Sequence, residues 1–376
     1  MKTPLSRRTF IGNSTLAGAA LASTPIFAAN INAGTKKLKC ALIGCGGRGN
    51  GAVKNFKEAC KILGIEATLV ATSDAFKSKA ESTGKAHGVP ADKCYGGYNG
   101  YKELLKSDAD FVLMATPPGF RPVHFRATIE AGKNAFIEKP VAVDPVGARH
   151  VIETGEMAKQ KGLAVVTGTQ RRHSQGYLRN KALIDAGAIG DIKGGVIQWN
   201  GRIPWIKRRA DGESEADYMA KNWLNFYELS GDHIVEQHVH NIDVCLWFMG
   251  KVPVSALGFG GRARRVTGNQ FDFFSVDLDV GDDVHIHSQC RQLAGTYSRV
   301  GEMFTGTEGS TSGGGKMNGK DFKVPDFKQV SGNGQVQEHV DMIRSVIAGK
   351  PLNEAQQIAE STMVAIMGRM SAYTGQ

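Results

Sequence analysis

The sequence predicts an α/β protein with two domains: an N-terminal doubly wound parallel sheet and a C-terminal α+β domain with a large, mostly antiparallel sheet. Over residues 36–168, short apolar runs of β character alternate with helical runs, the pattern of a parallel sheet covered by helices. After Gly168, aromatic segments punctuated by glycine indicate long strands. The 376 residues also exceed one typical domain. We expect residues 169–335 to form the second domain and the helices of residues 336–376 to pack back on the first.

The elements of the first domain follow from its apolar runs and from what ends them. Residues 38–43 form the first expected strand, and residues 52–63 carry apolar side chains at helical spacing. The strand expected at 111–115 stops at Thr116-Pro117-Pro118, a break where a ligand-binding loop is expected. Pro145 marks the start of a helix, where its missing N–H costs little. The other expected strands are 65–72, 135–138 and 163–167.

The second domain is expected to hold four long strands and one helix. The helix is predicted over residues 234–248, and helical spacing returns over residues 337–370. Residues 306–334 are rich in Gly, Ser and Lys, which predicts an exposed loop. The sequence shows no internal repeat and no coiled-coil heptad. The expected strands are 194–200, 254–262, 271–280 and 284–289.

Residues 1–29 have the three parts of a signal peptide: basic residues, an apolar stretch over residues 16–27, and the small residues Ala28 and Ala29. The paired arginines in Ser6-Arg7-Arg8-Thr9-Phe10-Ile11 predict export to the periplasm by the twin-arginine pathway. The apolar stretch falls short of the roughly 20 residues of a membrane span, so we expect cleavage near Ala28 and no stable membrane insertion afterwards. An uncleaved anchor, or a cytoplasmic protein whose leader is misread, is the alternative.

Composition argues against a nucleic-acid partner and against a disulfide framework. The formal net charge is +10, but the charges are spread along the chain without runs of like sign, and part of the excess lies in the leader. The cysteines show no CxxC and no metal-like spacing, and several lie in apolar segments, which favours buried free thiols over disulfides. The six are Cys40, Cys45, Cys60, Cys94, Cys245 and Cys290.

A dinucleotide fingerprint, Gly44-Cys45-Gly46-Gly47-Arg48-Gly49, follows the first strand and opens a helix. Glycines there let backbone N–H groups approach a pyrophosphate at the positive end of the helix. Asp74 ends the next strand, where the acceptor for a ribose hydroxyl belongs. We therefore expect NAD to be bound by Gly44, Gly46, Gly47, Arg48, Gly49 and Asp74. A carboxylate repels the extra phosphate of NADP, although the nearby Lys77 and Lys79 leave NADP open.

Glu138-Lys139-Pro140 stands at the carboxyl end of a predicted strand, the edge of an open α/β sheet at which ligands bind. A partly desolvated lysine beside a cationic ring can have its pKa lowered enough to help remove a hydroxyl proton. We assign Thr116, Pro117, Glu138 and Lys139 to the cofactor site, and the family that these motifs together resemble implies a catalytic role for Lys139. The alternative is that Lys139 only pairs with Glu138 for stability.

A third motif, Ser230 to Asp243, carries Glu236, His240 and Asp243 at spacings of four and three, which on one helix share a face. We expect His240 to handle the proton, Glu236 to orient the substrate or the histidine, and Asp243 to bind substrate. No acid or cysteine set completes a ligand spacing around the histidines of this segment, so no metal is expected, with zinc and a merely structural histidine cluster as alternatives.

Further substrate contacts are expected from Gln170, Arg171, Arg172 and His173, since arginine offers a rigid fork of donors for hydroxyls or an anion. An exposed basic turn is the alternative. Aromatic residues before the third motif can stack on sugar faces or simply belong to the core. They are Trp199, Trp205, Trp223 and Tyr227.

Together the fingerprint, the Ala115-Thr116-Pro117 turn, Glu138-Lys139-Pro140 and the later helix resemble the Gfo/Idh/MocA oxidoreductase family over nearly the whole chain after the leader. The resemblance implies a Rossmann domain, places Lys139 beside the nicotinamide and the substrate, and puts a glutamate, Glu236, where members commonly carry aspartate. It is strongest to exported members from glycan-degrading bacteria. Such chains usually run somewhat past the residues at which this one stops, Gln376.

The predicted function is that of an NAD(P)-dependent oxidoreductase that oxidises a secondary hydroxyl of a sugar or glycoside, with ring position C3 as the first choice. Because no NAD(H) pool is maintained outside the inner membrane, a tightly bound, recycled NAD is favoured. An NAD-dependent glycoside hydrolase or lyase that works by transient oxidation and elimination is the first alternative. A non-catalytic sugar-binding protein is the second. A homodimer or homotetramer is expected from the resemblance.

Overall fold

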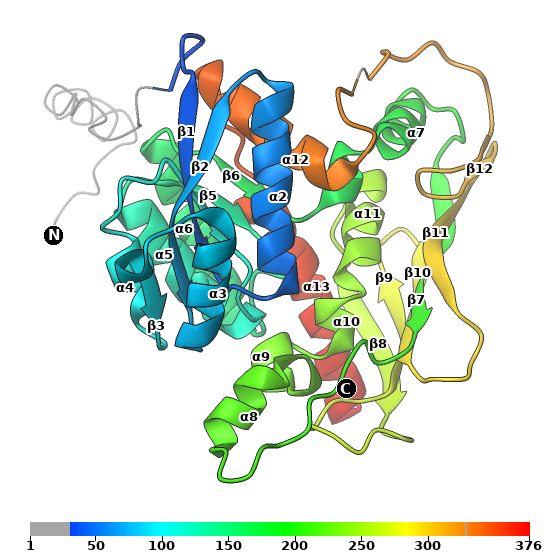
Figure 1. The fold of residues 1–376 in the computed structure, drawn as a ribbon. Coiled ribbons are helices and arrows are strands. Elements are labelled where there is room, and N and C mark those ends of the chain that lie inside the picture. The colour runs from blue at the N-terminus through cyan, green and yellow to red at the C-terminus, as the bar shows by residue number, and fades with distance from the viewer. Residues whose placement is uncertain (1–30, 328) are drawn as a thin grey trace, which may run out of the picture.

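The computed structural model describes residues 31–327 and 329–376, and Figure 1 shows two sheets with helices packed around and between them. The predicted leader, with its twin-arginine motif, lies outside the described residues. Within the described residues, every helix is too short or too polar to span a bilayer. The fold class is the predicted one, a parallel doubly wound sheet followed by a mixed, mostly antiparallel sheet.

The first sheet is parallel and has the strand order β3-β2-β1-β4-β5-β6. The order reverses between β1 and β4, and at such a switch point the crevice beyond the carboxyl ends of the strands receives ligands. The five predicted strands are confirmed, and the short edge strand β3 was not predicted. The strands are β1 (Lys37–Ile43), β2 (Glu66–Asp74), β3 (Cys94–Gly96), β4 (Phe111–Met114), β5 (Asn134–Ile137) and β6 (Val165–Thr167).

Helices cover both faces of this sheet (Figure 1). The helix that begins in the fingerprint, α2 (Gly47–Ile62), buries Phe56 completely, a contribution of about 1.5–3 kcal/mol. In α6 (Pro145–Gln160), Pro145 stands at the first turn and Asp144 caps the helix, accepting a hydrogen bond from the Gly147 N–H at 2.7 Å. The other elements are α3 (Lys77–His87), α4 (Gly100–Leu104), α5 (Arg121–Glu130), η1 (Ala91–Lys93) and η2 (Pro118–Phe120).

The second sheet has the order β13-β12-β11-β7-β10-β9-β8, in which only the pairing of β7 with β10 is parallel. The loop predicted over residues 306–334 is wrong in part, because the chain there forms two short strands that extend the sheet beyond β11. The strands are β7 (Ile192–Gly201), β8 (Ser255–Gly261), β9 (Phe273–Asp279), β10 (His285–Gln292), β11 (Arg299–Gly306), β12 (Ser310–Thr311) and β13 (Met317–Asn318).

The single helix predicted over residues 234–248 is two helices, α10 (His233–Glu236) and α11 (Val239–Met249). At the break the His238 N–H reaches back five residues to the His233 carbonyl, and the His238 side chain contacts Ser288 of β10 at 2.8 Å. Both helices are buried on nearly every side, so apolar periodicity could not reveal the break. The remaining elements here are η3 (Gln170–His173), α7 (Gln175–Asp185), α8 (Glu215–Lys221), η4 (Trp223–Asn225) and α9 (Tyr227–Ser230).

Two C-terminal helices connect the halves of the molecule (Figure 1). The first, α12 (Gly334–Ile347), packs on α2 and inserts Val340 and Ile343 into the same core as Phe56. The second, α13 (Ala355–Thr374), lies against both α6 and β8. These contacts fix the second sheet and its helices over the carboxyl edge of the first sheet, where the site lies.

Candidate active site

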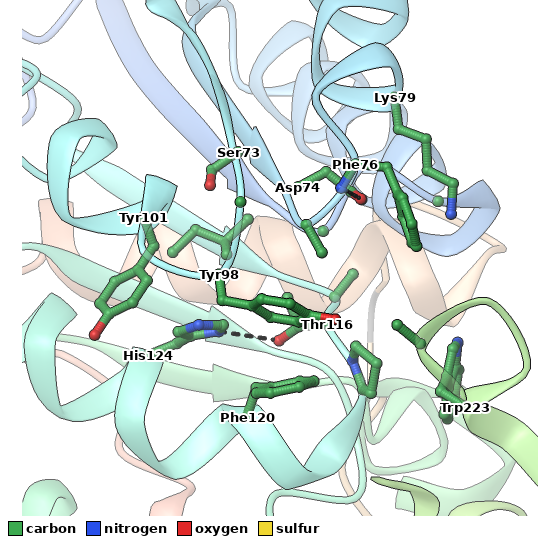
Figure 2. A pocket seen from close by; sticks show the side chains of 18 residues that line it. Ser73, Asp74, Phe76, Lys79, Tyr98, Tyr101, Thr116, Phe120, His124 and Trp223 are labelled. Carbon is green, nitrogen blue, oxygen red and sulfur yellow. Dashed lines mark hydrogen bonds between the residues drawn. The ribbon is translucent and has the colours of Figure 1, made fainter. Parts of the chain in front are cut away.

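A cleft opens at the carboxyl edge of the first sheet, beside the switch point between β1 and β4 (Figure 2). It encloses about 690 Å³, including space open to solvent. Its lining includes residues of the fingerprint, the end of β2, the β3–α4 loop, the β4–α5 turn and η4. Among them are the predicted Gly44, Gly46, Asp74, Thr116 and Pro117.

The fingerprint glycines serve two different purposes. Gly44 has φ +93°, and a Cβ there would lie 2.7 Å from the Thr116 nitrogen, while a Cβ on Gly49 would lie 1.9 Å from the Gly44 oxygen. Those two glycines permit the turn and the contact of helix with strand. A Cβ on Gly46 or Gly47 would meet nothing within 4 Å. Their open side, at the N-terminus of α2, fits the pyrophosphate of a dinucleotide.

Asp74 is half-buried at the end of β2, and its carboxylate accepts hydrogen bonds from the backbone N–H groups of Cys45 (2.8 Å) and Phe76 (2.9 Å). It therefore ties the fingerprint to the end of β2 while bordering the cleft. Lys79 also lines the cleft, with its ammonium 4.7 Å from the centre of the Phe76 ring. Lys77 pairs instead with Glu81, 3.7 Å away.

One wall of the cleft is aromatic, which was not predicted (Figure 2). His124 lies with its ring centre 4.5 Å from that of Tyr101, and its Nδ1 is 3.2 Å from the Thr116 hydroxyl. Burial, followed by the charge of Arg121, lowers the pKa of His124 to about 4, so the ring is neutral at neutral pH. The aromatic residues come from separate segments, so no sequence pattern could have grouped them. They are Phe76, Tyr98, Tyr101, Phe120, His124 and Trp223.

A second cavity, of about 650 Å³ including open space, lies between the two sheets and brings Lys139, Glu236 and His240 together. Ala115 and Trp223 line both this cavity and the nucleotide cleft, so the two are neighbours. Trp223, which the sequence offered for stacking or core, is therefore a wall between them. The other lining residues are Arg48, Arg121, Glu138, Gly168, Gln170, Gln335 and Glu338.

Lys139 follows β5 and is held by Glu236 of α10. Its ammonium donates to the Glu236 backbone oxygen at 2.6 Å and lies 3.3 Å from Oε1 of the same residue. Both side chains are about a tenth exposed. The side chain of the neighbouring Glu138 does not pair with Lys139 but forms an ion pair with Arg48, in the first turn of α2. The Lys139–Glu138 pair considered from sequence is thus not formed, and Glu236 orients the lysine.

His240 lies in the first turn of α11, and its ring stacks on Trp199 with centres 5.5 Å apart. Burial, then the charges of Lys139, Arg171 and Arg48, lowers the pKa of His240 well below its usual value, so the imidazole is neutral at neutral pH. A neutral imidazole has a lone pair that can accept a proton, and the same burial and neighbouring charges make that proton easy to release again.

The other histidines of this segment have separate partners. His233 pairs with Asp232 at 2.9 Å, and His238 bonds to Ser288. Among residues 31–327 and 329–376, no group of three or more His, Cys, Asp or Glu side chains is arranged to hold a metal ion. The six cysteines, all described, are buried free thiols, as predicted.

Arg172 and Asp243, both predicted to contact substrate, pair with each other. The guanidinium donates two hydrogen bonds to the carboxylate, at 2.8 and 2.9 Å, and Asp243 also accepts one from Ser361 of α13 at 2.9 Å. The carboxylate is buried. These residues join η3, α11 and α13 and do not border the cavity.

Arg171 and His173 are likewise engaged within the protein. Arg171 pairs with Glu302 of β11. His173 lies between two carboxylates, with Nδ1 2.8 Å from Asp341 and Nε2 3.0 Å from Glu354. Of the four residues predicted from residues 170–173, only Gln170 borders the cavity.

The fold and the two adjoining cavities define a class: a dinucleotide-binding protein with a Rossmann domain and a second sheet domain beside the carboxyl edge of its first sheet. Comparison with known families identifies the particular one. Residues 38–169 match the description "Oxidoreductase family, NAD-binding Rossmann fold", and residues 177–312 match "GFO/IDH/MocA C-terminal domain". The chain belongs to the Gfo/Idh/MocA family of oxidoreductases, and its first domain binds NAD(P).

Relatives of known description are distant in sequence. An inositol 2-dehydrogenase from Burkholderia cenocepacia is 30% identical over 66% of this chain and 66% of its own length. A glycosyl hydrolase family 109 protein from Shewanella pealeana is 25% identical over 64% of this chain and 54% of its own length. The chain thus spans about half to two thirds of these relatives.

Solved structures share the fold over most of the chain. The WlbA dehydrogenase from Chromobacterium violaceum, in complex with NADH and UDP-GlcNAcA, has a TM-score of 0.71 at 18% identity, covering 91% of this chain and 96% of that one. The aldose-aldose oxidoreductase from Caulobacter crescentus, complexed with glycerol, has a TM-score of 0.67 at 17% identity, covering 91% and 99%.

Proposed function

We propose that the chain oxidises a secondary hydroxyl of a sugar or cyclic polyol to a ketone, with NAD preferred over NADP. The observation that carries the proposal is one cavity, bordered by Lys139, Glu236 and His240, that adjoins the nucleotide cleft through Ala115 and Trp223. This cavity lies beyond the carboxyl ends of β4 and β5, where a Rossmann domain presents the reactive end of its cofactor.

Each residue of the cavity has a role that its surroundings suit. The Gly46-Gly47 backbone, Asp74, Thr116 and Pro117 hold NAD, which when bound accepts a hydride from the carbinol carbon. The neutral His240 takes the hydroxyl proton.

The Lys139 ammonium stabilises the negative charge that develops on the substrate oxygen, and Glu236 holds that ammonium at the cavity wall. Glu236 is thereby a positioning residue for the lysine.

The substrate class is supported by the chemistry of the lining and by the names of relatives. Carboxylate, amide, guanidinium and ammonium groups at the cavity wall suit a ligand with several hydroxyls. Relatives include an inositol 2-dehydrogenase, and a structural neighbour was solved with a nucleotide sugar. Like them, this chain is proposed to act on a ring that carries neighbouring hydroxyls.

The cofactor is proposed to remain bound and to be recycled in a periplasmic enzyme, because the leader predicts export and the periplasm maintains no NAD(H) pool. Purified leaderless protein can be denatured and its released nucleotide identified by mass and counted by absorbance. About one NAD per chain is expected. Protein that releases no nucleotide would instead indicate an exchangeable cofactor. Light scattering of the same sample tests the proposed homo-oligomer.

A second candidate is net glycoside cleavage without net oxidation. A ketone next to a C–H bond makes that bond acidic, so the neutral His240 could remove the proton while the alcohol on the next carbon leaves with a proton of its own. Water then adds to the resulting double bond, and the stored hydride returns to the ketone carbon. Similarity to a family 109 glycosyl hydrolase favours this version. Glycoside cleavage is distinguished from net oxidation by two measurements on one glycoside: the aglycone is released, and the absorbance of reduced nicotinamide shows no net change.

The variants Lys139→Ala and His240→Ala test the proposed roles, with Lys139→Arg as the control that retains a cation. We expect sugar-dependent reduction of the nicotinamide to fall about 10²- to 10⁴-fold in both alanine variants, with NAD affinity little changed. The proposal fails if Lys139→Ala reduces NAD as fast as the unaltered chain with every sugar and cyclitol tested.

A further inference from the structure

One carboxyl group at the cavity has no role in the reaction described above. Glu338, in α12, borders the same cavity as Lys139 and His240, yet its side chain is only 1% exposed. Neither carboxyl oxygen has a hydrogen-bond partner among the described residues. A buried carboxyl group without a hydrogen-bond partner is costly, so its position at a cavity wall points to a bound molecule as the missing partner.

The charges around Glu338 favour its neutral form. Arg48 forms a long ion pair with Glu338: its Nη2 lies 3.8 Å from Oε1, beyond hydrogen-bonding distance, and its Nε donates to Glu138. Burial, then the charge of Glu138, raises the pKa of Glu338 well above its usual value, against the opposing charges of His173 and Arg48. A neutral carboxyl group offers one O–H donor and one carbonyl acceptor.

The helix that carries Glu338 is held rigidly. One turn further along α12, Asp341 accepts a hydrogen bond from Gln337 at 2.8 Å and pairs with His173 of η3. On another side, His339 packs between Phe56 and Phe136 in the core. Glu338 therefore cannot turn out to solvent, and its donor and acceptor are pre-positioned at the cavity.

We propose that Glu338 recognises the carboxamide of the cofactor's nicotinamide, its O–H donating to the amide oxygen and its carbonyl accepting from the amide NH₂. The inference rests on the proposed function. A primary carboxamide carries one acceptor and a donor in one plane, which matches a neutral carboxyl group with two hydrogen bonds. Glu338 stands beside Arg48 and Glu138, near the N-terminus of the fingerprint helix, in the cavity that extends to Lys139.

The test compares NAD⁺ with ADP-ribose, which shares every part of NAD⁺ except the nicotinamide. Nucleotide-free full-length protein and its Glu338→Ala and Glu338→Gln variants are titrated with each nucleotide in a calorimeter. We expect Glu338→Ala to weaken NAD⁺ about tenfold and to leave ADP-ribose within about twofold. Glu338→Gln retains a donor and an acceptor and is expected to lose much less than the alanine variant.

The unfolding temperature of nucleotide-free protein separates a binding role of Glu338 from a structural one, because the two roles predict opposite changes in the Glu338→Gln variant. Because Glu338 is an unpartnered buried acid, Glu338→Gln is expected to unfold at the same temperature as the unaltered chain or higher. A fall in its unfolding temperature would show that Glu338 stabilises the fold through Arg48, and would overturn the inference.

The remaining outcomes separate the possible partners. If Glu338→Ala lowers the affinities for NAD⁺ and ADP-ribose equally, the inference is overturned, because Glu338 would then contact a part that both nucleotides share. Unchanged affinity for both, with a raised KM for the sugar, would assign Glu338 to the substrate and overturn it as well. An unaltered chain that binds neither nucleotide would refute the proposed function itself, and this inference with it.

Discussion

His173 is the most informative residue to perturb, because the sequence predicts a substrate contact and the structure places it in a buried ion cluster. Its imidazole, 7% exposed, lies 2.8 Å from Asp341 and 3.0 Å from Glu354. Glu354 also accepts hydrogen bonds from the N–H and the hydroxyl of Thr167, at the end of β6. Replacing His173 with Gln removes the cation that two carboxylates share. For one partner of a buried ion pair, such a loss costs about 3–5 kcal/mol of unfolding free energy.

The same cluster predicts how stability changes with pH. Burial opposes the charge on His173, but Glu354 and the hydrogen bonds to Asp341 and Glu354 outweigh it and raise the pKa of His173 to about 10. A folded pKa above the unfolded value of about 6.5 adds stability that is complete below about pH 6.5 and is lost as the pH rises toward 10. The cluster also lowers the pKa of Glu354, although burial opposes this, so that its share of stability is lost only under acidic conditions.

Urea unfolding of the unaltered chain and of His173→Gln, between about pH 6 and pH 10, checks both points. The unaltered chain is expected to lose unfolding free energy across this window, while the variant starts lower and changes less. Equal stability of the two proteins at about pH 6, with a raised KM for the sugar in the variant, would refute the ion-cluster account and restore His173 to the substrate site.

Two further predictions concern the nucleotide cleft. At Gly46, φ is −76° and an added Cβ would meet nothing within 4 Å, so Gly46→Ala is expected to leave the unfolding free energy unchanged but to weaken NAD binding. At Gly49, an added Cβ would lie 1.9 Å from the Gly44 oxygen, so Gly49→Ala is expected to lower the unfolding free energy by about 1–3 kcal/mol. Urea unfolding and calorimetric titration separate the two, and equal behaviour of both variants would contradict the distinct roles of the glycines. Asp74→Asn removes a negative charge beside the expected ribose site and is expected to shift the ratio of NADP to NAD affinity about tenfold toward NADP; an unchanged ratio would show that Asp74 does not select the cofactor.

The first sheet could be predicted because its information is local. Each of the five predicted strands is a short apolar run with a clear break after it, and the fingerprint glycines adopt the conformations that their spacing demands. The two strands that were not predicted, β3 and β11, depend on contacts with the rest of the fold. Strand β3 has three residues at a sheet edge, and β11 carries Arg299, Glu302 and two glycines, so neither shows a strand pattern.

The candidate site could be assigned from the sequence only where a motif follows a predicted strand or lies near one in space, and the roles assigned there stay predictions. Lys139 follows a strand that the sequence locates, and His240 belongs to a motif near it in space. The partners of Arg171 and His173 lie more than a hundred residues away, so spacing could not show that both are occupied. Glu338 lies in an ordinary amphipathic helix, where a glutamate is normally exposed, and only the packing of α12 on α2 buries it.

The proposed reaction is oxidation of a polyol hydroxyl by a nicotinamide cofactor held beside Lys139 and His240. The most direct measurement mixes leaderless protein and NAD⁺ with a panel of inositols, monosaccharides and glycosides and records the absorbance of reduced nicotinamide in a single turnover. At least one compound is expected to raise this absorbance in the unaltered chain and not in Lys139→Ala. Tight NAD⁺ binding with no absorbance change and no product from any compound would contradict the account.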